Sequence, residues 1–111
     1  MSDRLTSRML ASALIRRAGQ EGGFATIVRK GDEVAGTILL ICLERGIETG
    51  LFERIPDYAG GYRLVPCGPT GSESQTERTQ YIERRTKSDP DIWLIELNIP
   101  QPERFAAETI C

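Results

Sequence analysis

Apolar residues repeat along this chain with two different periods, and each period predicts one kind of element. Between residues 5 and 18 they recur every three or four positions, which predicts an amphipathic helix that ends at the glycines of positions 19, 22 and 23. Between residues 92 and 99 both alternating sets of positions carry apolar residues, which predicts a strand that is apolar on both faces. On that strand one face carries Trp93, Ile95, Leu97 and Ile99, and the other carries Ile92 and Leu94.

The segment after the first helix has the composition of a β-hairpin. Residues 24–29 and 34–43 are rich in apolar and β-branched side chains, and Lys30-Gly31-Asp32-Glu33 between them resembles a tight turn. The second strand is apolar on both faces over residues 38–43, so we expect it at the centre of the sheet. Two shorter strands are expected at residues 51–55 and 62–65.

A second helix is expected over residues 73–87. Ser74 and Glu77 have the spacing of a capping box at its start, and its apolar face is thin. We therefore expect this helix to lie on the surface, held to the sheet by a few contacts. A short terminal helix is expected over residues 103–110, after the prolines that end the last strand.

The expected order α-β-β-β-β-α-β predicts an α+β fold. We expect a two-layer domain, in which a mostly antiparallel five-stranded sheet carries its two main helices on one face. With 111 residues the chain is one domain, and it is long enough to bury a core without a metal or a disulfide.

Charge and cysteine content narrow the classes of function. The net charge of −2 opposes general binding to nucleic acid or an anionic membrane, although residues 1–20 carry +3. That basic start is read as a helix with solvent-facing arginines, with a transit peptide as the alternative. No apolar run approaches the roughly 20 residues of a membrane span. Three widely separated cysteines fit reduced thiols, so we expect a cytoplasmic protein.

Three blocks of this sequence resemble one family of small alphaproteobacterial proteins, catalogued as a domain of unknown function (number 1491). They are the segment from Phe24 to Gly36, the stretch Leu51-Phe-Glu-Arg54, and the closing block from Ser88 to Glu96. The resemblance covers nearly the whole chain, from Arg4 to about Leu97. It implies a bacterial cytoplasmic protein with a small α+β fold, and it brings no activity, cofactor or catalytic residue.

The absence of histidine removes the commonest catalytic and metal-binding arrangements. Asp89 and Asp91 flank Pro90, and because a residue before proline is pushed towards an extended conformation, both carboxylates can point to one side. Two close carboxylates of this kind can bind a hard cation, or they can repel each other so that their pKa values move apart. The structural alternative is a helix exit, in which these carboxylates pair with nearby cations such as Arg84.

Arginines of the expected sheet are a second candidate. Arg29, Arg54 and Arg63 could form a carboxylate or phosphate clamp if two of them share a face on adjacent strands. Arg54 is the first of these to test, and the alternative is an exposed or paired strand charge. Cys67 and the loop Gly68-Pro-Thr-Gly-Ser72 are weaker candidates for a reactive thiol and a phosphate loop, since the loop lacks the Gly-Lys-Ser/Thr ending of a nucleotide site.

The sequence favours a non-enzymatic protein-interaction module or subunit. Its partner would be another protein, or a second copy joined through an edge strand. The alternative is a small enzyme, or an anion- or metal-binding domain, with a polar site of Arg54, Arg84, Asp89 and Asp91. No cofactor and no metal site are expected. Nucleic-acid binding through the first helix is the least favoured hypothesis, because aromatic residues for base stacking are few.

Overall fold

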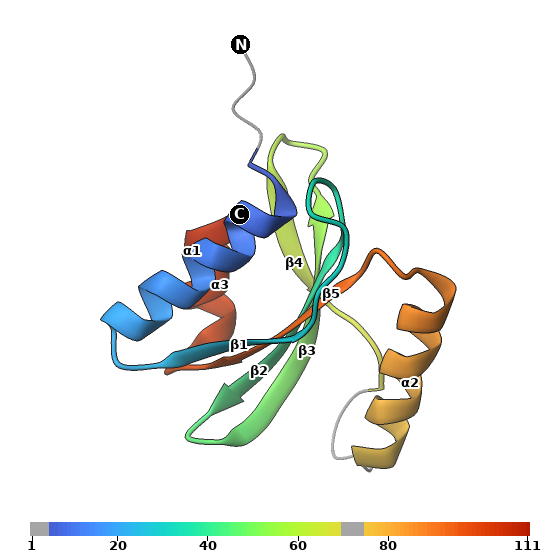
Figure 1. The fold of residues 1–111 in the computed structure, drawn as a ribbon. Coiled ribbons are helices and arrows are strands. Elements are labelled where there is room, and N and C mark those ends of the chain that lie inside the picture. Colours follow the sequence, from blue (N-terminus) through green and yellow to red (C-terminus); the bar gives the residue numbers. More distant parts are fainter. Residues whose placement is uncertain (1–4, 70–74) are drawn as a thin grey trace.

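A five-stranded mixed sheet forms the centre of the molecule, with helices on both of its faces (Figure 1). The computed structural model describes residues 5–69 and 75–111. The elements are α1 (Ser7–Gln20), β1 (Phe24–Arg29), β2 (Ile38–Glu44), β3 (Ile47–Pro56), β4 (Tyr62–Pro66), α2 (Gln75–Ser88), β5 (Trp93–Asn98) and α3 (Pro102–Ile110). The α+β class, the order of the elements and the short terminal helix are confirmed.

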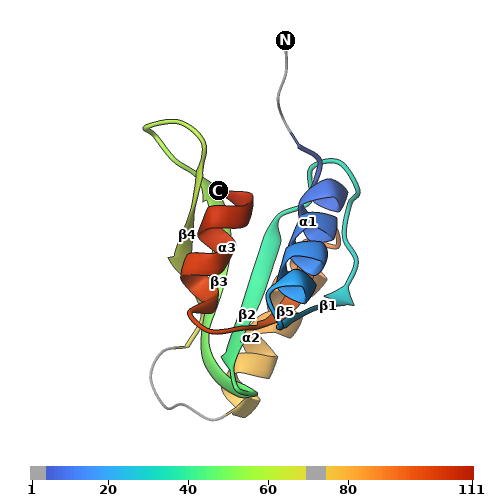
Figure 2. The ribbon, with the colours of Figure 1, turned by 90° about the vertical axis from the view of Figure 1, so that its left-hand side faces the viewer.

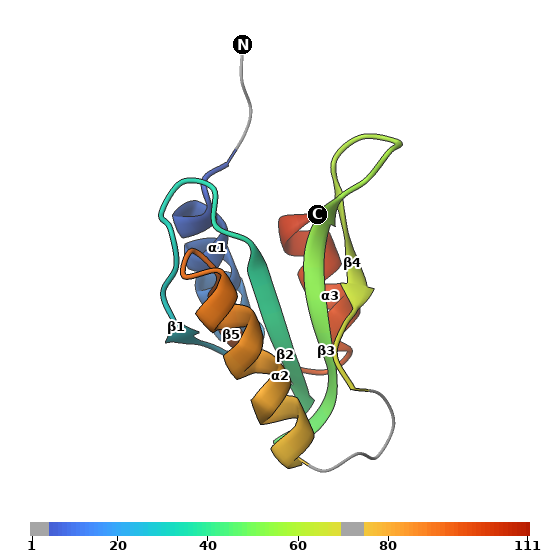
Figure 3. The ribbon, with the colours of Figure 1, turned by 90° about the vertical axis from the view of Figure 1, so that its right-hand side faces the viewer.

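The strands lie in the order β1-β5-β2-β3-β4. The β1–β5, β2–β3 and β3–β4 pairs are antiparallel, and β2 runs parallel to β5. The sheet is therefore mostly antiparallel, and the apolar strand β2 lies at its centre as expected. The two edge strands are β1 and β4, which lie on opposite sides in Figure 3.

One face of the sheet packs against α1 and α3, which lie side by side over it (Figure 2). Leu10, Leu14 and Ala18 of α1 are buried there, at the helical spacing read from the sequence. Thr6 caps this helix, because its side chain accepts a hydrogen bond from the Met9 amide. Trp93, Ile95 and Leu97 of β5 join the same core cluster, and Leu39, Ile92 and Leu94 form a second cluster.

The second cluster lies on the opposite face, under α2 (Figure 3). The expectation that the helices share one face is therefore wrong. The physical reason is that β2 and β5 carry apolar side chains on both faces, and each face needs a cover. The expected surface position of this helix is confirmed, since α2 has no buried residue and contributes only Ile82 to the cluster. The proposed capping residue Ser74 lies outside the described residues.

The expected hairpin between β1 and β2 is also wrong. These strands do not pair, because β5 lies between them, and residues 30–37 form a wide connection across the start of β5. A Cβ added to Gly31 or Gly36 would lie 2.0 or 2.1 Å from the Asp91 carbonyl oxygen. Both positions therefore need glycine so that the connection can pass over the backbone of β5.

Candidate functional site

The Asp89-Pro90-Asp91 junction has the geometry of a helix exit. The Asp89 amide closes the last turn of α2 on the Arg85 carbonyl, and the Asp89 side chain accepts the Asp91 amide at 3.0 Å. The Asp89 carbonyl accepts the Ile92 amide at 3.3 Å. The Asp89 carboxylate is thus used in a local turn, as in the helix exit read from the sequence, while Asp91 is exposed. Neither carboxylate takes part in the ion pairs formed within residues 5–69 and 75–111, so the cation pairing expected with that exit is not seen.

Beyond this turn the chain is fixed to the connection between β1 and β2. The Asp91 carbonyl accepts the Asp32 amide at 3.0 Å, and the Trp93 amide donates to the Thr37 carbonyl at 2.8 Å. The Trp93 ring is 1% exposed, and its Nε1 donates to the Asp32 carbonyl at 2.6 Å. Trp93 therefore belongs to the core under α1 and α3. Its side chain points to the face opposite α2, so Trp93 is not one of the contacts that hold α2 to the sheet.

The four residues proposed as one polar site lie apart. Arg54 of β3 faces α3, where its Nε donates to the Ile110 carbonyl at 2.7 Å. Arg84 is exposed on α2, across the sheet from Arg54. Asp89 and Asp91 lie at the end of that helix, and the arginine that reaches their turn is Arg29, whose Nη2 donates to the Pro90 carbonyl at 3.4 Å.

The arginines considered for a clamp on the sheet do not lie together. Arg54 pairs in register with Leu64, while Arg63 pairs with Ile55, so the two guanidinium groups leave opposite sides of the β3–β4 pair. Arg29 lies on β1, at the far edge of the sheet from β4. Glu53 and Arg54 point to opposite faces of the sheet, since their partners lie on α2 and α3 respectively.

The most developed polar cluster was missed by the sequence reasoning. Arg85 of α2 makes a two-pronged ion pair with Glu53 of β3, with both nitrogen–oxygen distances at 3.1 Å, and donates to the Tyr81 hydroxyl at 2.7 Å. Two turns earlier, Arg78 pairs with Glu48 of the same strand. Residues seven apart on a helix share a face, so Arg78 and Arg85 could have been predicted to point the same way. Because the helix has only a thin apolar face, this spacing could have indicated that ion pairs hold it to the sheet.

This cluster fastens α2 to the sheet and is poorly suited to catalysis. Burial raises the pKa of the Cys67 thiol, although its hydrogen bond with Tyr81 works in the opposite direction. Burial likewise raises the pKa of Tyr81, against the effect of Arg85. The Glu53 carboxylate raises the pKa of Arg85. Cys67 and Tyr81 are therefore neutral near pH 7, and Cys67 lacks the depressed pKa of a nucleophilic cysteine. The loop proposed for phosphate lies largely outside the described residues.

A cleft of about 640 Å³ opens on the other side of the molecule. It lies between the start of α1 with residues 34–38 on one side and the ends of β3, β4 and α3 on the other. Arg54 lines it together with Tyr62, and the guanidinium carbon lies 3.7 Å from the centre of the tyrosine ring. Of the four residues in the sequence-predicted site, Arg54 is the one that lines this cleft.

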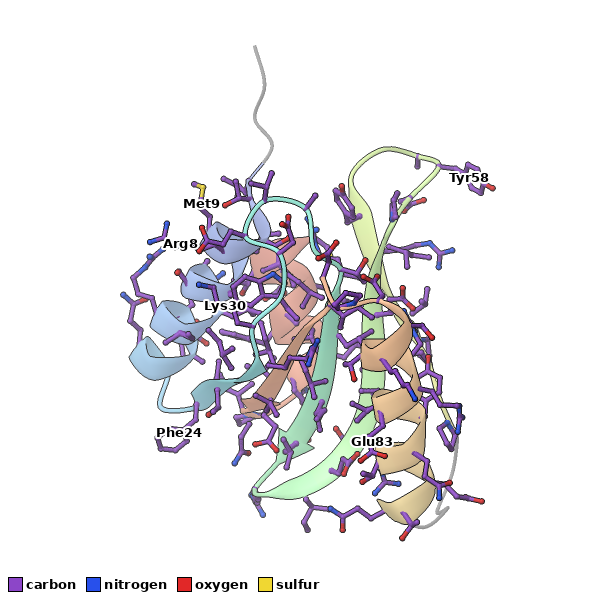
Figure 4. All side chains as sticks on the ribbon, turned by 45° about the vertical axis from the view of Figure 1, so that its right-hand side comes forward. Arg8, Met9, Phe24, Lys30, Tyr58 and Glu83 are labelled. Atoms are coloured by element: carbon purple, nitrogen blue, oxygen red, sulfur yellow. The ribbon has the colours of Figure 1, made fainter. Side chains whose placement is uncertain are left out.

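Exposed apolar side chains gather on the side formed by α1 and β1. β1 is an edge strand, and Phe24 is 70% exposed, Val28 52% and Ile27 39%. Met9 and Ile15 of α1 are also exposed. Figure 4 shows Met9 and Phe24 projecting outward from the same side of the molecule. Exposed apolar residues in such a group are unusual for a surface without a partner.

Metal-binding groups are not gathered in residues 5–69 and 75–111: no three cysteine or acidic side chains there lie close enough to hold an ion. Within the same part of the chain, none of the helices has the length and apolar character needed to cross a membrane.

Comparisons with known proteins agree on one family. A family model described as "Protein of unknown function (DUF1491)" matches residues 5–107. The chain is 34% identical to a DUF1491 family protein from Caulobacter crescentus CB15 known from a crystal structure, with a TM-score of 0.75 over 92% of this chain and 94% of that one. An NMR structure of a DUF1491 family protein from the same organism gives 34% identity and a TM-score of 0.72, over 91% of each chain.

A third solved structure comes from a second alphaproteobacterium. The solution structure of a protein from A. tumefaciens is 29% identical to this chain, with a TM-score of 0.69 over 88% of both chains. None of the curated proteins compared with the chain matches it. The family resemblance read from the three sequence blocks is therefore confirmed, together with the fold.

Proposed function

The chain belongs to the DUF1491 family of proteins of unknown function, and we propose that it works as a non-enzymatic protein-interaction module whose β1 edge receives an extended segment of another protein. The observation that carries this proposal is an edge strand with an open ladder and three exposed apolar side chains, those of Phe24, Ile27 and Val28. Strand addition to such an edge is a recurrent mode of peptide recognition.

The backbone of β1 supplies the hydrogen-bonding groups of this site. β1 pairs with β5 alone, so every second residue of β1 directs its amide and carbonyl away from the sheet. The register shift between Ile27 and Arg29 interrupts the ladder. A bulge of this kind limits continuous pairing, so the segment from Phe24 to Ile27 is the part that can accept a strand of defined length.

The apolar side chains supply its contact surface. Alternate residues of an added strand would lie beside Phe24 on one face of the sheet and Ile27 on the other. α1 packs against β1, and its exposed Met9 and Ile15 extend the apolar surface past the strand. A strand carrying apolar side chains would therefore bury surface on both this chain and itself, which supports association.

The charge at this edge favours another protein over a second copy of this chain as the partner. Arg29 lies on the edge strand itself and takes part in none of the ion pairs formed within residues 5–69 and 75–111, whereas the charge of Arg8 on α1 acts on nearby Glu33. A second copy would bring a second Arg29 to the contact, whereas an acidic segment would neutralise this charge. The partner is therefore an extended segment that combines apolar residues with aspartate or glutamate.

Selection from a displayed random-peptide library tests this assignment. We expect enrichment of extended sequences that alternate apolar residues and carry acidic ones. Phe24→Glu should weaken their binding at least tenfold, because it removes the apolar contact and places a negative charge opposite the acidic segment. Ile47→Glu is the matched control, since Ile47 is 71% exposed at the start of β3, outside the proposed site.

Two outcomes would contradict the proposal. Peptides that bind wild-type protein and Phe24→Glu equally well would place the interaction elsewhere. A homodimer seen by light scattering that dissociates in Phe24→Glu would replace the acidic partner with a second copy. The alternative of a single polar site at the Asp89-Pro90-Asp91 junction has no comparable support, because Arg54 lies on the opposite face of the sheet from α2.

A further inference from the structure

The cleft beside Arg54 combines one fixed cation with mostly apolar walls. Leu5, Leu10 and Ile38 line one part of it, and Pro56, Tyr62 and Ile110 line another. Its volume of about 640 Å³ lies within the roughly 300–1,000 Å³ that is usual for sites of small molecules. None of the described residues that line it is acidic.

Arg54 is held in a defined orientation. Its Nε is committed to the Ile110 carbonyl at 2.7 Å, and its guanidinium plane lies against the Tyr62 ring at 3.7 Å. These two contacts fix the side chain at its Nε and along its face. Arg54 also makes a side-chain hydrogen bond with the Cys111 thiol, and the N–H groups of its terminal nitrogens that this bond leaves over can meet a ligand carboxylate.

Arg54 is paired with no acidic side chain of the described residues. It takes part in none of the ion pairs formed within residues 5–69 and 75–111. Partial burial raises the pKa of the Cys111 thiol even though Arg54 beside it acts in the opposite direction. That thiol is therefore protonated near pH 7 and supplies no negative charge.

Other donors around the cleft are already used. The first amides of α1 donate within the protein: those of Ser7 and Arg8 to the carbonyls of Val34 and Glu33, and that of Met9 to the Thr6 side chain. The Ser7 hydroxyl donates to the Gly36 carbonyl at 2.6 Å. The helix start is thus closed to an anion, and Arg54 is the charged group that the cleft presents to a ligand.

We infer that this cleft binds a small apolar or aromatic molecule with a single carboxylate, held by the terminal nitrogens of Arg54. One cation matches one negative charge, which disfavours polyphosphates. The apolar walls match a hydrocarbon or aromatic body. This site is separate from the β1 edge, and neither assignment depends on the other.

Titration of the ¹⁵N-labelled protein at pH 7 with octanoate and benzoate tests the inference, with 1-octanol and benzyl alcohol as neutral counterparts. We expect saturable amide shifts at the residues that line the cleft, with each acid binding at least tenfold more tightly than its alcohol. Arg54→Gln should weaken binding of the acids at least tenfold and leave the alcohols unchanged. Arg63→Gln is the matched control, because this exposed arginine lies on the adjacent strand and leaves its opposite face.

The inference is overturned if acid and alcohol bind wild-type protein equally, if neither binds, or if the shifts lie outside the cleft. It is also overturned if Arg54→Gln binds the acids as wild-type protein does. Should Arg54→Gln fail to fold, Arg54→Lys keeps the charge without the fork, and it should bind the acids more weakly than wild-type protein does. The comparison of acid with alcohol on wild-type protein decides the matter independently of any variant.

Discussion

Replacing Arg85 with glutamine is expected to loosen α2 from the sheet without disturbing the main core. α2 has no buried residue, and the main core cluster lies on the opposite face. Its described attachments to the sheet are the Arg85–Glu53 and Arg78–Glu48 pairs and the contact of Ile82 with Leu39, Ile92 and Leu94. We therefore expect the Arg85–Glu53 pair to contribute much of the free energy that holds this helix on the sheet.

The magnitude follows from geometry and exposure. Both nitrogen–oxygen distances are 3.1 Å, and the side chains of Arg85 and Glu53 are 29% and 23% exposed. Exposed pairs contribute about 0.2–1 kcal/mol, and breaking a fully buried pair costs about 3–5 kcal/mol. For this partly buried, two-pronged pair we expect a coupling energy of about 1.5 kcal/mol. In a domain of this size that corresponds to a fall in Tm of about 6 °C.

A double-mutant cycle in urea measures the coupling, with Arg85→Gln, Glu53→Gln and the combined variant. The Arg104–Glu108 pair is the matched control, since its side chains are 73% and 59% exposed and four residues apart on α3. Its coupling should lie below about 0.5 kcal/mol. A coupling between Arg85 and Glu53 no larger than that of the control would refute the ionic clamp and leave the apolar contact of Ile82 as the attachment.

Four further predictions concern the core and its close contacts. Gly31→Ala should lower the free energy of unfolding by about 2–3 kcal/mol because its Cβ would meet the backbone of Asp91 and Ile92, just before β5. Gly19→Ala, whose Cβ meets nothing within 4 Å, should leave this free energy unchanged or raise it slightly, and urea titration measures both variants. Trp93→Phe removes the donor to the Asp32 carbonyl and should cost about 2–3 kcal/mol by the same measurement. Burial raises the pKa of the Cys42 thiol to about 12, so a thiol reagent at pH 8 should label Cys111 first and reach Cys42 only on unfolding, as mass spectrometry would show. Because the unfolded Cys42 thiol ionises near pH 9 while the folded one keeps its proton, the free energy of unfolding should fall as pH rises from about 9 to 12, and less steeply in Cys42→Ala.

Local periodicity explains which elements the sequence predicted. The stripe of Leu10, Leu14 and Ala18 identifies α1, and the alternation from Ile92 to Ile99 assigns both faces of β5, because each pattern is read within a single element. The pairing of β1 was not predictable in this way. Lys30 and Glu33 form an ion pair at 3.0 Å, yet the connection to which they belong spans β5 and is not a tight turn.

The path of that connection is determined by contacts with residues about sixty positions later in the chain. Gly31 and Gly36 leave room for the Asp91 carbonyl, and the Asp32 carbonyl receives the indole of Trp93. A tight-turn signature reports local preference alone, and here long-range packing overrides it. The candidate site followed the same rule: the sequence singled out Arg54, but its separation from Asp89 depends on α2 covering the opposite face of the sheet.

If β1 accepts an added strand from an acidic partner, that strand should protect the backbone of β1 from solvent. Amide hydrogen exchange of β1, measured with and without a saturating selected peptide, shows whether it does. Added backbone hydrogen bonds should slow exchange at the outward-facing amides between Phe24 and Ile27, and the Phe24→Glu variant should show little change. Protection that appears at β4 or on α2, with the β1 amides unchanged, would contradict the account.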